Sequence, residues 1–229
     1  MSEQRSGSLP NRAIDSDAVL WNVPLDERSG KPLLVMMHGL GSHEGDLFGL
    51  NRFLPEGIVV ASLRAPLEYA GGFAWFQAGA QSSSADTALL DASVAGVLNW
   101  IDGLDFAPEG IGLMGFSQGG CMALQLIREA PERFDYVLQL SGFVAPTWHP
   151  GDAALAAREP RMPVFWAHGE HDQVISQSAV EHTGMWLAEH AAVESHRYPM
   201  AHTVSQEELA DLVEFVSAQL TERMGSDSE

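Results

Sequence analysis

Short, continuous apolar runs recur along the chain, and they constrain its fold more than any other feature. Each run contains four or five residues, and they lie at 33–37, 58–61, 111–114, 136–140 and 163–167. Runs of this length without polar alternation are typical of strands buried on both faces of a parallel sheet. A more polar run at 193–198 predicts a strand at the edge of the same sheet.

Amphipathic helical segments are predicted between and after these runs. Apolar residues recur every three or four positions in 90–104, and 176–190 and 205–223 show the same pattern. The last segment opens with Ser205 and has Glu208 three residues later, which is the signature of a capping box. Strands that alternate with helices predict an α/β fold with a mostly parallel central sheet and helices on both faces.

The length and composition of the chain favour one large domain. Its 229 residues, of which 45% are hydrophobic and 19% charged, can bury a substantial core. We expect a single domain over residues 15–224, with disordered segments at 1–14 and 225–229. The longest irregular stretch, 141–162, is too short to form a large cap domain.

The charge of the chain narrows the choice of partners. The sequence has 12 basic and 31 acidic residues, which give a formal net charge of -19. A field of this sign repels phosphate backbones and anionic lipid surfaces, so we expect no nucleic-acid partner. No apolar run approaches the roughly 20 residues that span a bilayer, so we expect no membrane insertion.

The single cysteine and the N-terminal segment favour a cytoplasmic protein. Cys121 has no second cysteine with which to form an intrachain disulfide, which fits a reducing compartment. Residues 1–13 are polar and contain no apolar core of a signal peptide. We expect a cytoplasmic monomer or homodimer.

A Gly-x-Ser-x-Gly pattern at 115–119 provides the first candidate for chemistry. It directly follows the apolar run 111–114 and directly precedes a helix-like segment at 121–129, which is the strand–turn–helix context of a nucleophile elbow. The glycines at positions 115 and 119 leave room for so tight a turn. We therefore predict that Ser117 is a nucleophile, and the alternative is a glycine-rich turn with an incidental serine.

A serine nucleophile needs a base and an acid, which follow it in the chain order Ser, Asp or Glu, His. Of the nine histidines, His202 lies between the last predicted strand and the last predicted helix, where the loop reaches the catalytic edge of the sheet. The loop after the run 163–167 offers Glu170 and Asp172, and we favour Asp172 because it lies further past the turn. We interpret His168 and His171 in this loop as structural or exposed residues.

Two backbone N–H groups are predicted to bind the oxyanion of a tetrahedral intermediate. Gln118, the residue after the nucleophile, provides one, and Leu40 in the glycine-containing loop after the first run provides the other. His38 is interpreted as a residue that braces this loop. The spacing of His43, Glu44 and Asp46 matches no metal motif, so we predict no metal and no cofactor.

These motifs together resemble those of the phospholipase/carboxylesterase family of α/β-hydrolases, which includes acyl-protein thioesterases and small bacterial carboxylesterases. The resemblance covers nearly the whole ordered chain and is carried by His38-Gly39-Leu40-Gly41, Arg64-Ala65-Pro66, Trp75-Phe76, Gly115-Phe116-Ser117-Gln118-Gly119-Gly120, His168-Gly169 with Asp172 and Val174-Ile175, and Ala201-His202-Thr203. It implies an α/β-hydrolase fold with the triad Ser117, Asp172 and His202 and the oxyanion amides of Leu40 and Gln118. Ala201 departs from the family, which often has Gly before the catalytic His.

Five aromatic residues lie in loops near the expected catalytic edge of the sheet. They are Phe73, Trp75, Phe76, Phe143 and Trp148. We expect some of them to line an apolar pocket for the acyl or alcohol group, and the alternative is ordinary packing beneath loops.

The sequence therefore predicts a serine hydrolase that cleaves small to medium carboxylic esters through an acyl-Ser117 intermediate. A thioesterase that acts on acylated proteins or small thioesters is an alternative. A non-catalytic, ligand-binding homologue is an alternative from another class. A lactone-opening enzyme of the dienelactone type would favour Cys at position 117, where this chain has Ser.

Overall fold

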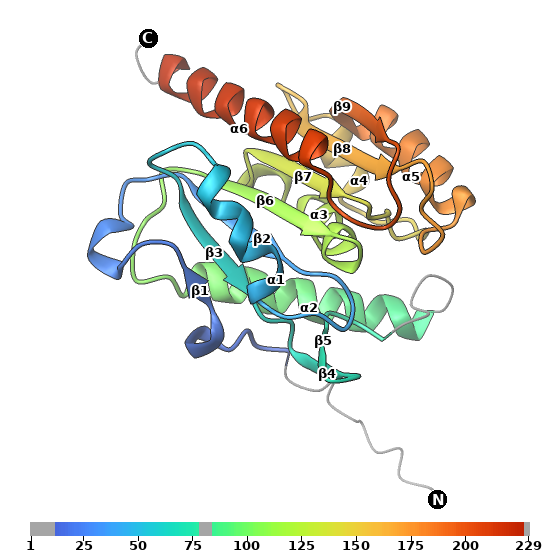
Figure 1. Cartoon of the computed structure of the whole chain (residues 1–229), viewed down its shortest axis with the longest axis horizontal. Coiled ribbons are helices and arrows are strands. Elements are labelled where there is room, and N and C mark those ends of the chain that lie inside the picture. The colour runs from blue at the N-terminus through green and yellow to red at the C-terminus, as the bar shows by residue number, and fades with distance from the viewer. Residues whose placement is uncertain (1–11, 78–83, 227–229) are drawn as a thin grey trace, which may run out of the picture.

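The computed structural model describes residues 12–77 and 84–226, and these residues form a central sheet of seven strands (Figure 1). The strands are β1 (Leu20–Trp21), β2 (Leu33–Met37), β3 (Val59–Leu63), β6 (Ile111–Phe116), β7 (Tyr136–Leu140), β8 (Met162–Gly169) and β9 (Ala191–Tyr198). They lie in the order β1-β3-β2-β6-β7-β8-β9 across the sheet. All neighbours are parallel except β1, which is antiparallel to β3.

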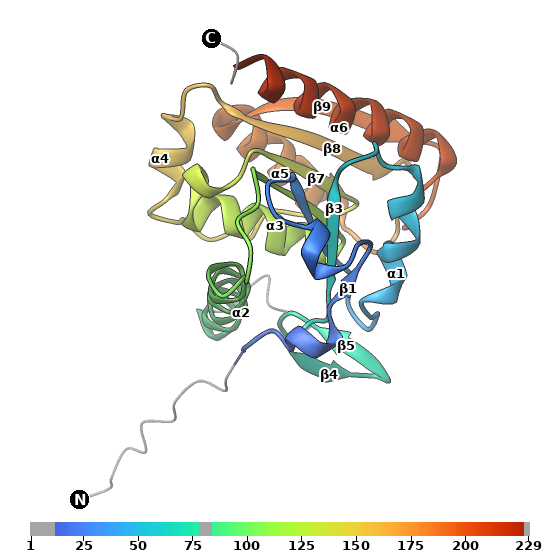
Figure 2. The ribbon, with the colours of Figure 1, turned by 90° about the vertical axis from the view of Figure 1, so that its left-hand side faces the viewer.

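Helices cover both faces of this sheet, as Figures 1 and 2 show. They are α1 (Gly45–Phe48), α2 (Ser84–Asp102), α3 (Gln118–Glu129), α4 (Asp152–Ala156), α5 (Gln177–His190) and α6 (Gln206–Ser226). Side chains of α2, α3, α4 and α5 share one buried cluster with the sheet, and those of α1 and α6 share the other. Short 3-10 helices lie at 16–18, 25–27, 49–53 and 131–133. The predicted α/β arrangement is confirmed.

The two core clusters explain why the central strands have continuous apolar sequences. Along β2, Leu33, Val35 and Met37 belong to one cluster. Leu34 and Met36 point to the opposite face and belong to the other cluster. None of these five side chains has exposed surface. Because complete burial of such a side chain contributes roughly 1.5–3 kcal/mol, neither face of this strand tolerates a polar residue well.

The structure reproduces the predicted strands and adds a hairpin that the sequence patterns did not indicate. Each predicted run overlaps a strand; β3 begins one residue later than predicted, and β6, β8 and β9 are longer than predicted. The hairpin consists of β4 (Leu67–Tyr69) and β5 (Gly72–Ala74), which are antiparallel. It contacts the loop after β2, because Gly41 and Phe73 are joined by a backbone hydrogen bond of 2.8 Å.

The predicted capping box is present at the start of α6. The Ser205 hydroxyl accepts a hydrogen bond of 3.0 Å from the Glu208 N–H, and a Glu208 carboxylate oxygen accepts one of 3.2 Å from the Ser205 N–H. This reciprocal pair satisfies two backbone donors that the helix start would otherwise leave unpaired. It fixes the point at which the chain leaves the 199–205 loop.

The domain extends beyond the boundaries expected from the sequence. Ile14 is 8% exposed and packs in the core cluster beneath α2, so the described residues 12–14 are part of the domain. At the other end, α6 continues to Ser226. The remaining parts of the two terminal segments, 1–11 and 227–229, lie outside the described residues.

The strand order brings two predicted functional loops together. Strand β2 lies between β3 and β6, and Met37 at its carboxyl end is the register partner of Gly115 in β6. The crossover direction of the chain changes at this point, and ligands of open α/β sheets bind at such switch points. Within the described residues, no large cap domain covers this edge, and no helix combines the length and apolarity needed to cross a membrane.

Candidate active site

Ser117 occupies a tight turn between β6 and α3, in the predicted strand–turn–helix context. Its backbone has φ of 56° and ψ of −114°, a conformation that side-chain-bearing residues rarely adopt. A Cβ on Gly115 would lie 2.1 Å from the Gly119 carbonyl oxygen, and one on Gly119 would lie 1.9 Å from the Met37 carbonyl oxygen. Only glycine therefore fits at either position, and the strained turn projects Ser117 from the edge of the sheet.

The surroundings of Ser117 hold its backbone and leave its hydroxyl free. The Ser117 N–H donates a hydrogen bond of 2.9 Å to the Leu140 carbonyl, and its own carbonyl accepts one of 3.2 Å from Cys121. The residue is 8% exposed. Its hydroxyl makes no hydrogen bond to any of the residues that the structure describes. A hydroxyl held in this way, at the N-terminus of a 12-residue helix, is available to a base and to an electrophile.

Asp172 and His202, which come from the loops after β8 and β9, are in direct contact. The His202 Nδ1 lies 2.7 Å from Asp172 Oδ2. The other carboxylate oxygen, Oδ1, accepts hydrogen bonds of 2.8 and 3.1 Å from the N–H groups of Val174 and Ile175. Burial tends to raise the pKa of Asp172, but the hydrogen bonds from His202 and the two amides lower it below the ordinary value. A carboxylate kept ionised in this way can orient and stabilise an imidazolium.

The structure distinguishes the two candidate acids, of which the sequence favoured Asp172. Glu170 is exposed, and its side chain makes no hydrogen bond to another described residue. The Asp172 side chain is only 4% exposed and lies against His202. The ring of His202 also lies 4.8 Å from that of Phe116, the residue before Ser117. Asp172, His202 and the nucleophile turn are therefore brought together, and Glu170 is not part of this group.

Leu40 and Gln118 lie at the ends of neighbouring strands, as predicted for a pair of oxyanion donors. Leu40 follows β2 and Gln118 is the first residue of α3. Neither backbone N–H donates a hydrogen bond to another described group. The Gln118 side chain has a separate role, which is to hold the segment after β5. Its Oε1 accepts a hydrogen bond of 2.8 Å from the Trp75 N–H, and its Nε2 donates a hydrogen bond of 2.8 Å to the Phe76 carbonyl.

His38 braces the loop that carries Leu40. Its Nδ1 lies 2.7 Å from the Gly39 carbonyl, and its Nε2 accepts a hydrogen bond of 3.2 Å from the Ala65 N–H. These partners require a neutral imidazole with its proton on Nδ1. Burial lowers the pKa of His38, which favours the same state. The interpretation of His38 as a structural residue fits this geometry.

Of the five aromatic residues from which a pocket was expected, Trp75, Phe76 and Phe143 follow the alternative and pack in the core. Their exposed fractions are 0%, 3% and 6%, and all three belong to the core cluster beneath α2 and α3. Trp75 is fixed there because its indole N–H donates a hydrogen bond of 2.8 Å to the His38 carbonyl. Phe73 is half-buried, and the Arg64 guanidinium carbon lies 4.7 Å from the centre of the Phe73 ring. Trp148 is 80% exposed.

The group His43, Glu44 and Asp46 contributes to loop structure. Both carboxylate oxygens of Glu44 accept hydrogen bonds from Arg64, and the Asp46 carboxylate accepts one of 2.7 Å from the Ser42 hydroxyl. The His43 Nδ1 accepts a hydrogen bond of 3.1 Å from the N–H of Gly45, where α1 begins. Among the described residues, no group of three or more His, Cys, Asp or Glu side chains is arranged to hold a metal ion.

Arg128 is a buried charged residue whose role the sequence analysis did not identify. Its guanidinium donates two hydrogen bonds to the Asp152 carboxylate, at 2.7 and 2.8 Å, and one to the Gln125 side chain. Two further bonds reach the carbonyls of Ala145 and Thr147. These contacts fix the loop that leaves the sheet beside Ser117. The only available signal was a cation on an otherwise apolar face of the helix 121–129.

The strand order, the strained turn after β6 and the contact between the loops after β8 and β9 define an α/β-hydrolase. Solved structures have the same fold. A carboxylesterase from Bacillus cereus matches with a TM-score of 0.71 at 19% identity, over 88% of this chain and 93% of that one. Acyl-protein thioesterase 2 from Zea mays matches with a TM-score of 0.71 at 24% identity, over 88% of this chain and 98% of that one.

The chain belongs to the phospholipase/carboxylesterase family, whose model matches residues 22–220. It is also similar to acyl-protein thioesterase 1 of Mycosarcoma maydis, with 34% identity over 138 residues, 56% of this chain and 55% of that protein. The protein of the same name from Kluyveromyces lactis is 30% identical over 118 residues, 50% of this chain and 52% of that protein. The chain thus matches about half the length of these curated relatives.

Proposed function

We propose that this protein is a serine hydrolase that cleaves carboxylic esters of small to medium acyl groups through an acyl-Ser117 intermediate. The observation that carries the proposal is the contact of 2.7 Å between His202 and Asp172 at the edge where Ser117 occupies a strained turn. Strain of this kind is retained at functional sites because the surrounding structure enforces it. Membership of the phospholipase/carboxylesterase family supports the same reaction class.

The proposed reaction has two halves. In the first, the Ser117 oxygen attacks the ester carbonyl while His202 takes its proton, and that proton then leaves with the alcohol. The N–H groups of Leu40 and Gln118 stabilise the oxyanion. In the second half, His202 removes a proton from water, which attacks the acyl carbonyl, and Ser117 recovers its proton as the carboxylic acid leaves. Catalytic hydrogen bonds are often completed only when substrate binds, which accounts for the free hydroxyl of Ser117.

Thioester hydrolysis is the second candidate function. Two relatives that are named acyl-protein thioesterases align with about half of this chain, at 30% and 34% identity. The same residues serve both reactions, and a thiolate leaves more easily than an alkoxide, so geometry alone does not distinguish them. A direct comparison of paired oxygen esters and thioesters with the same acyl group decides between the two.

Covalent labelling tests the hydrolase proposal against a non-catalytic binding protein. A fluorophosphonate is expected to modify Ser117 stoichiometrically, to leave Ser117→Ala unmodified and to label Ser217→Ala as fully as the unaltered protein. Ser217 is a suitable control because it is exposed on α6. A folded protein that takes up no label would refute the nucleophile assignment and support the binding protein.

A panel of p-nitrophenyl esters of increasing chain length then measures the acyl preference. We expect the highest kcat/KM for short or intermediate chains and no requirement for an added cofactor. Equal activity of Ser117→Ala on this panel would contradict the mechanism.

We further propose that the protein acts in the cytoplasm as a monomer or homodimer on small-molecule esters, without a nucleic-acid partner. The single buried Cys121 fits a reducing compartment, and the net charge of -19 opposes contact with polyanions. Light scattering coupled to size exclusion gives the oligomeric state, and a mass above that of a dimer would contradict the proposal.

A further inference from the structure

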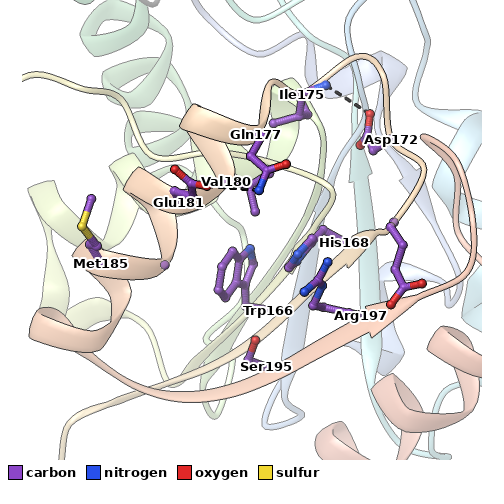
Figure 3. A pocket seen from close by; sticks show the side chains of 13 residues that line it. Trp166, His168, Asp172, Ile175, Gln177, Val180, Glu181, Met185, Ser195 and Arg197 are labelled. Atoms are coloured by element: carbon purple, nitrogen blue, oxygen red, sulfur yellow. Dashed lines mark hydrogen bonds between the residues drawn. The ribbon is translucent and has the colours of Figure 1, made fainter.

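A pocket of about 590 Å³ lies between α5 and the paired strands β8 and β9 (Figure 3). Its volume is within the range of small-molecule sites, roughly 300–1,000 Å³. Trp166, His168 and Arg197 lie together between the strands and the helix, with Val180 of α5 facing them. Met185, which is largely exposed, lies at the rim of the pocket. Ser117 does not line this pocket.

The floor of the pocket is set by the register of two strands. Trp166 pairs with Ser195 and His168 pairs with Arg197, so all four side chains point to the α5 face of the sheet. The rings of Trp166 and His168 stack with centres 4.8 Å apart and planes at 29°. A Cβ on Gly184 would lie 2.9 Å from the indole ring, so a glycine lets α5 approach Trp166 closely.

This floor contains three nitrogen-bearing side chains that have no acceptor. His168 is 9% exposed, its Nδ1 is covered and unpartnered, and its Nε2 makes no hydrogen bond within the described residues. The indole nitrogen of Trp166 is also covered and unpartnered. The Arg197 guanidinium is exposed and forms no ion pair or hydrogen bond with a described residue. Native proteins rarely leave buried polar atoms unpaired, because each costs about 1–3 kcal/mol.

The carboxylates on the walls restrict the charge of a ligand. Both oxygens of Asp172 are engaged, by His202 and by the amides of Val174 and Ile175. Glu181 accepts a hydrogen bond of 3.1 Å from Gln177. Glu170 has no such partner and would repel a second negative charge. Hydrogen bonding leaves all three carboxylates charged, so Arg197, the only described arginine or lysine that lines the pocket, can balance at most one ligand carboxylate, and a polyanion is disfavoured.

We propose that this pocket is a second small-molecule site, which binds a planar monocarboxylate. The carboxylate pairs with Arg197 and accepts a hydrogen bond from the Nε2–H of His168, because Nδ1 is covered, and the flat apolar body lies on Trp166 beside Val180. Burial and the neighbouring Arg197 lower the pKa of His168, so the neutral imidazole still offers one N–H donor. The proposal does not depend on the reaction at Ser117, because the pocket shares only Asp172 with the proposed triad and leaves both of its oxygens on their present partners.

Benzoate is a suitable probe, because it combines one carboxylate with a flat ring. In the 15N-labelled protein, the indole N–H signal of Trp166, assigned with Trp166→Phe among the six tryptophans, is expected to shift saturably with benzoate. Arg197→Gln should weaken binding about tenfold or more, as expected for loss of a charge-assisted hydrogen bond. Benzamide, which has the same ring without the charge, should also bind more weakly.

Two controls make the result decisive. Arg161→Gln removes an arginine directly before β8 that does not line the pocket, and it should bind benzoate as the unaltered protein does. Protein labelled with fluorophosphonate at Ser117 should also retain binding. So small a ligand is expected to bind with a Kd of roughly millimolar to tens of millimolar. The proposal is overturned if the shift of the Trp166 indole signal does not approach saturation in this range of benzoate concentration. It is equally overturned if Arg197→Gln binds as tightly as the unaltered protein, or if binding disappears after labelling.

Discussion

Glu208 gives the structure a specific dependence of stability on pH. Its side chain has no exposed surface, one of its carboxylate oxygens has no partner, and the other accepts the Ser205 N–H of the capping box. Burial disfavours the charged form and raises the pKa from 4.5 to about 7, although the Ser205 hydrogen bond opposes this shift. Between these two values, the folded chain holds a proton that the unfolded chain releases.

The sign and size of the effect follow from this difference in bound protons. Stability falls as pH rises through the window from 4.5 to about 7, and one pKa unit corresponds to about 1.36 kcal/mol. The full window therefore represents about 3 kcal/mol. Glu208→Gln keeps an acceptor for the Ser205 N–H and has no charge to bury. The stability of this variant should therefore not fall as pH rises through the window.

Urea unfolding followed by tryptophan fluorescence measures the difference. Because the sequence pI is about 4.6, the comparison is best made from about pH 5.5 to pH 8. Over this range the free energy of unfolding of Glu208→Gln should rise relative to the unaltered protein by about 2 kcal/mol. Glu207→Gln, which alters an exposed residue on the same turn, should give a constant difference. Parallel curves for Glu208→Gln and the unaltered protein would refute the argument from burial.

Three further predictions concern the site and its supports. Asp172→Asn should lower kcat by on the order of 10³-fold or more in an ester assay, whereas Glu170→Gln should retain most activity; the reverse result would make Glu170 the acid. Gly119→Ala places a Cβ 1.9 Å from the Met37 carbonyl oxygen and should reduce the free energy of unfolding in urea by about 3 kcal/mol or more. Gly49→Ala, whose Cβ would have no atom within 4 Å, should change it little in the same assay. Arg128→Ala should lose about 3–5 kcal/mol of the free energy of unfolding, because it leaves the Asp152 charge buried without its partner. Arg128→Lys should not restore this loss, because Lys cannot replace five hydrogen bonds. Recovery of stability by Lys would mean that charge alone matters.

The parts of the fold that depend on local pattern could be predicted from the sequence. Continuous apolar runs gave the central strands because both faces of β2, β6 and β7 are buried. The glycines around Ser117 indicated the turn because no side chain fits beside it. Loop position also selected His202, since a sheet of parallel strands places every such loop at one edge.

Other features depend on contacts that a sequence does not display. Aromatic residue type did not reveal that Trp75 is turned inward, where its indole N–H donates a hydrogen bond to the His38 carbonyl in the loop after β2. The β4–β5 hairpin turns at Ala70 and Gly71, both with positive φ, and Ala is not a usual turn signal there. Glu170 and Asp172 carry the same chemical group, so the sequence could favour Asp172 only by its position in the loop, and the path of the loop shows which of them contacts His202.

The Gln118 side chain also links the exchange behaviour of distant segments. The Trp75 N–H donates to Gln118 Oε1, and these residues are 43 positions apart. This amide can exchange its hydrogen with solvent only when the bond opens, so its protection depends on the integrity of the turn at Ser117. Hydrogen–deuterium exchange at Trp75 is therefore a remote reporter of order at the nucleophile, and it can be read without any substrate.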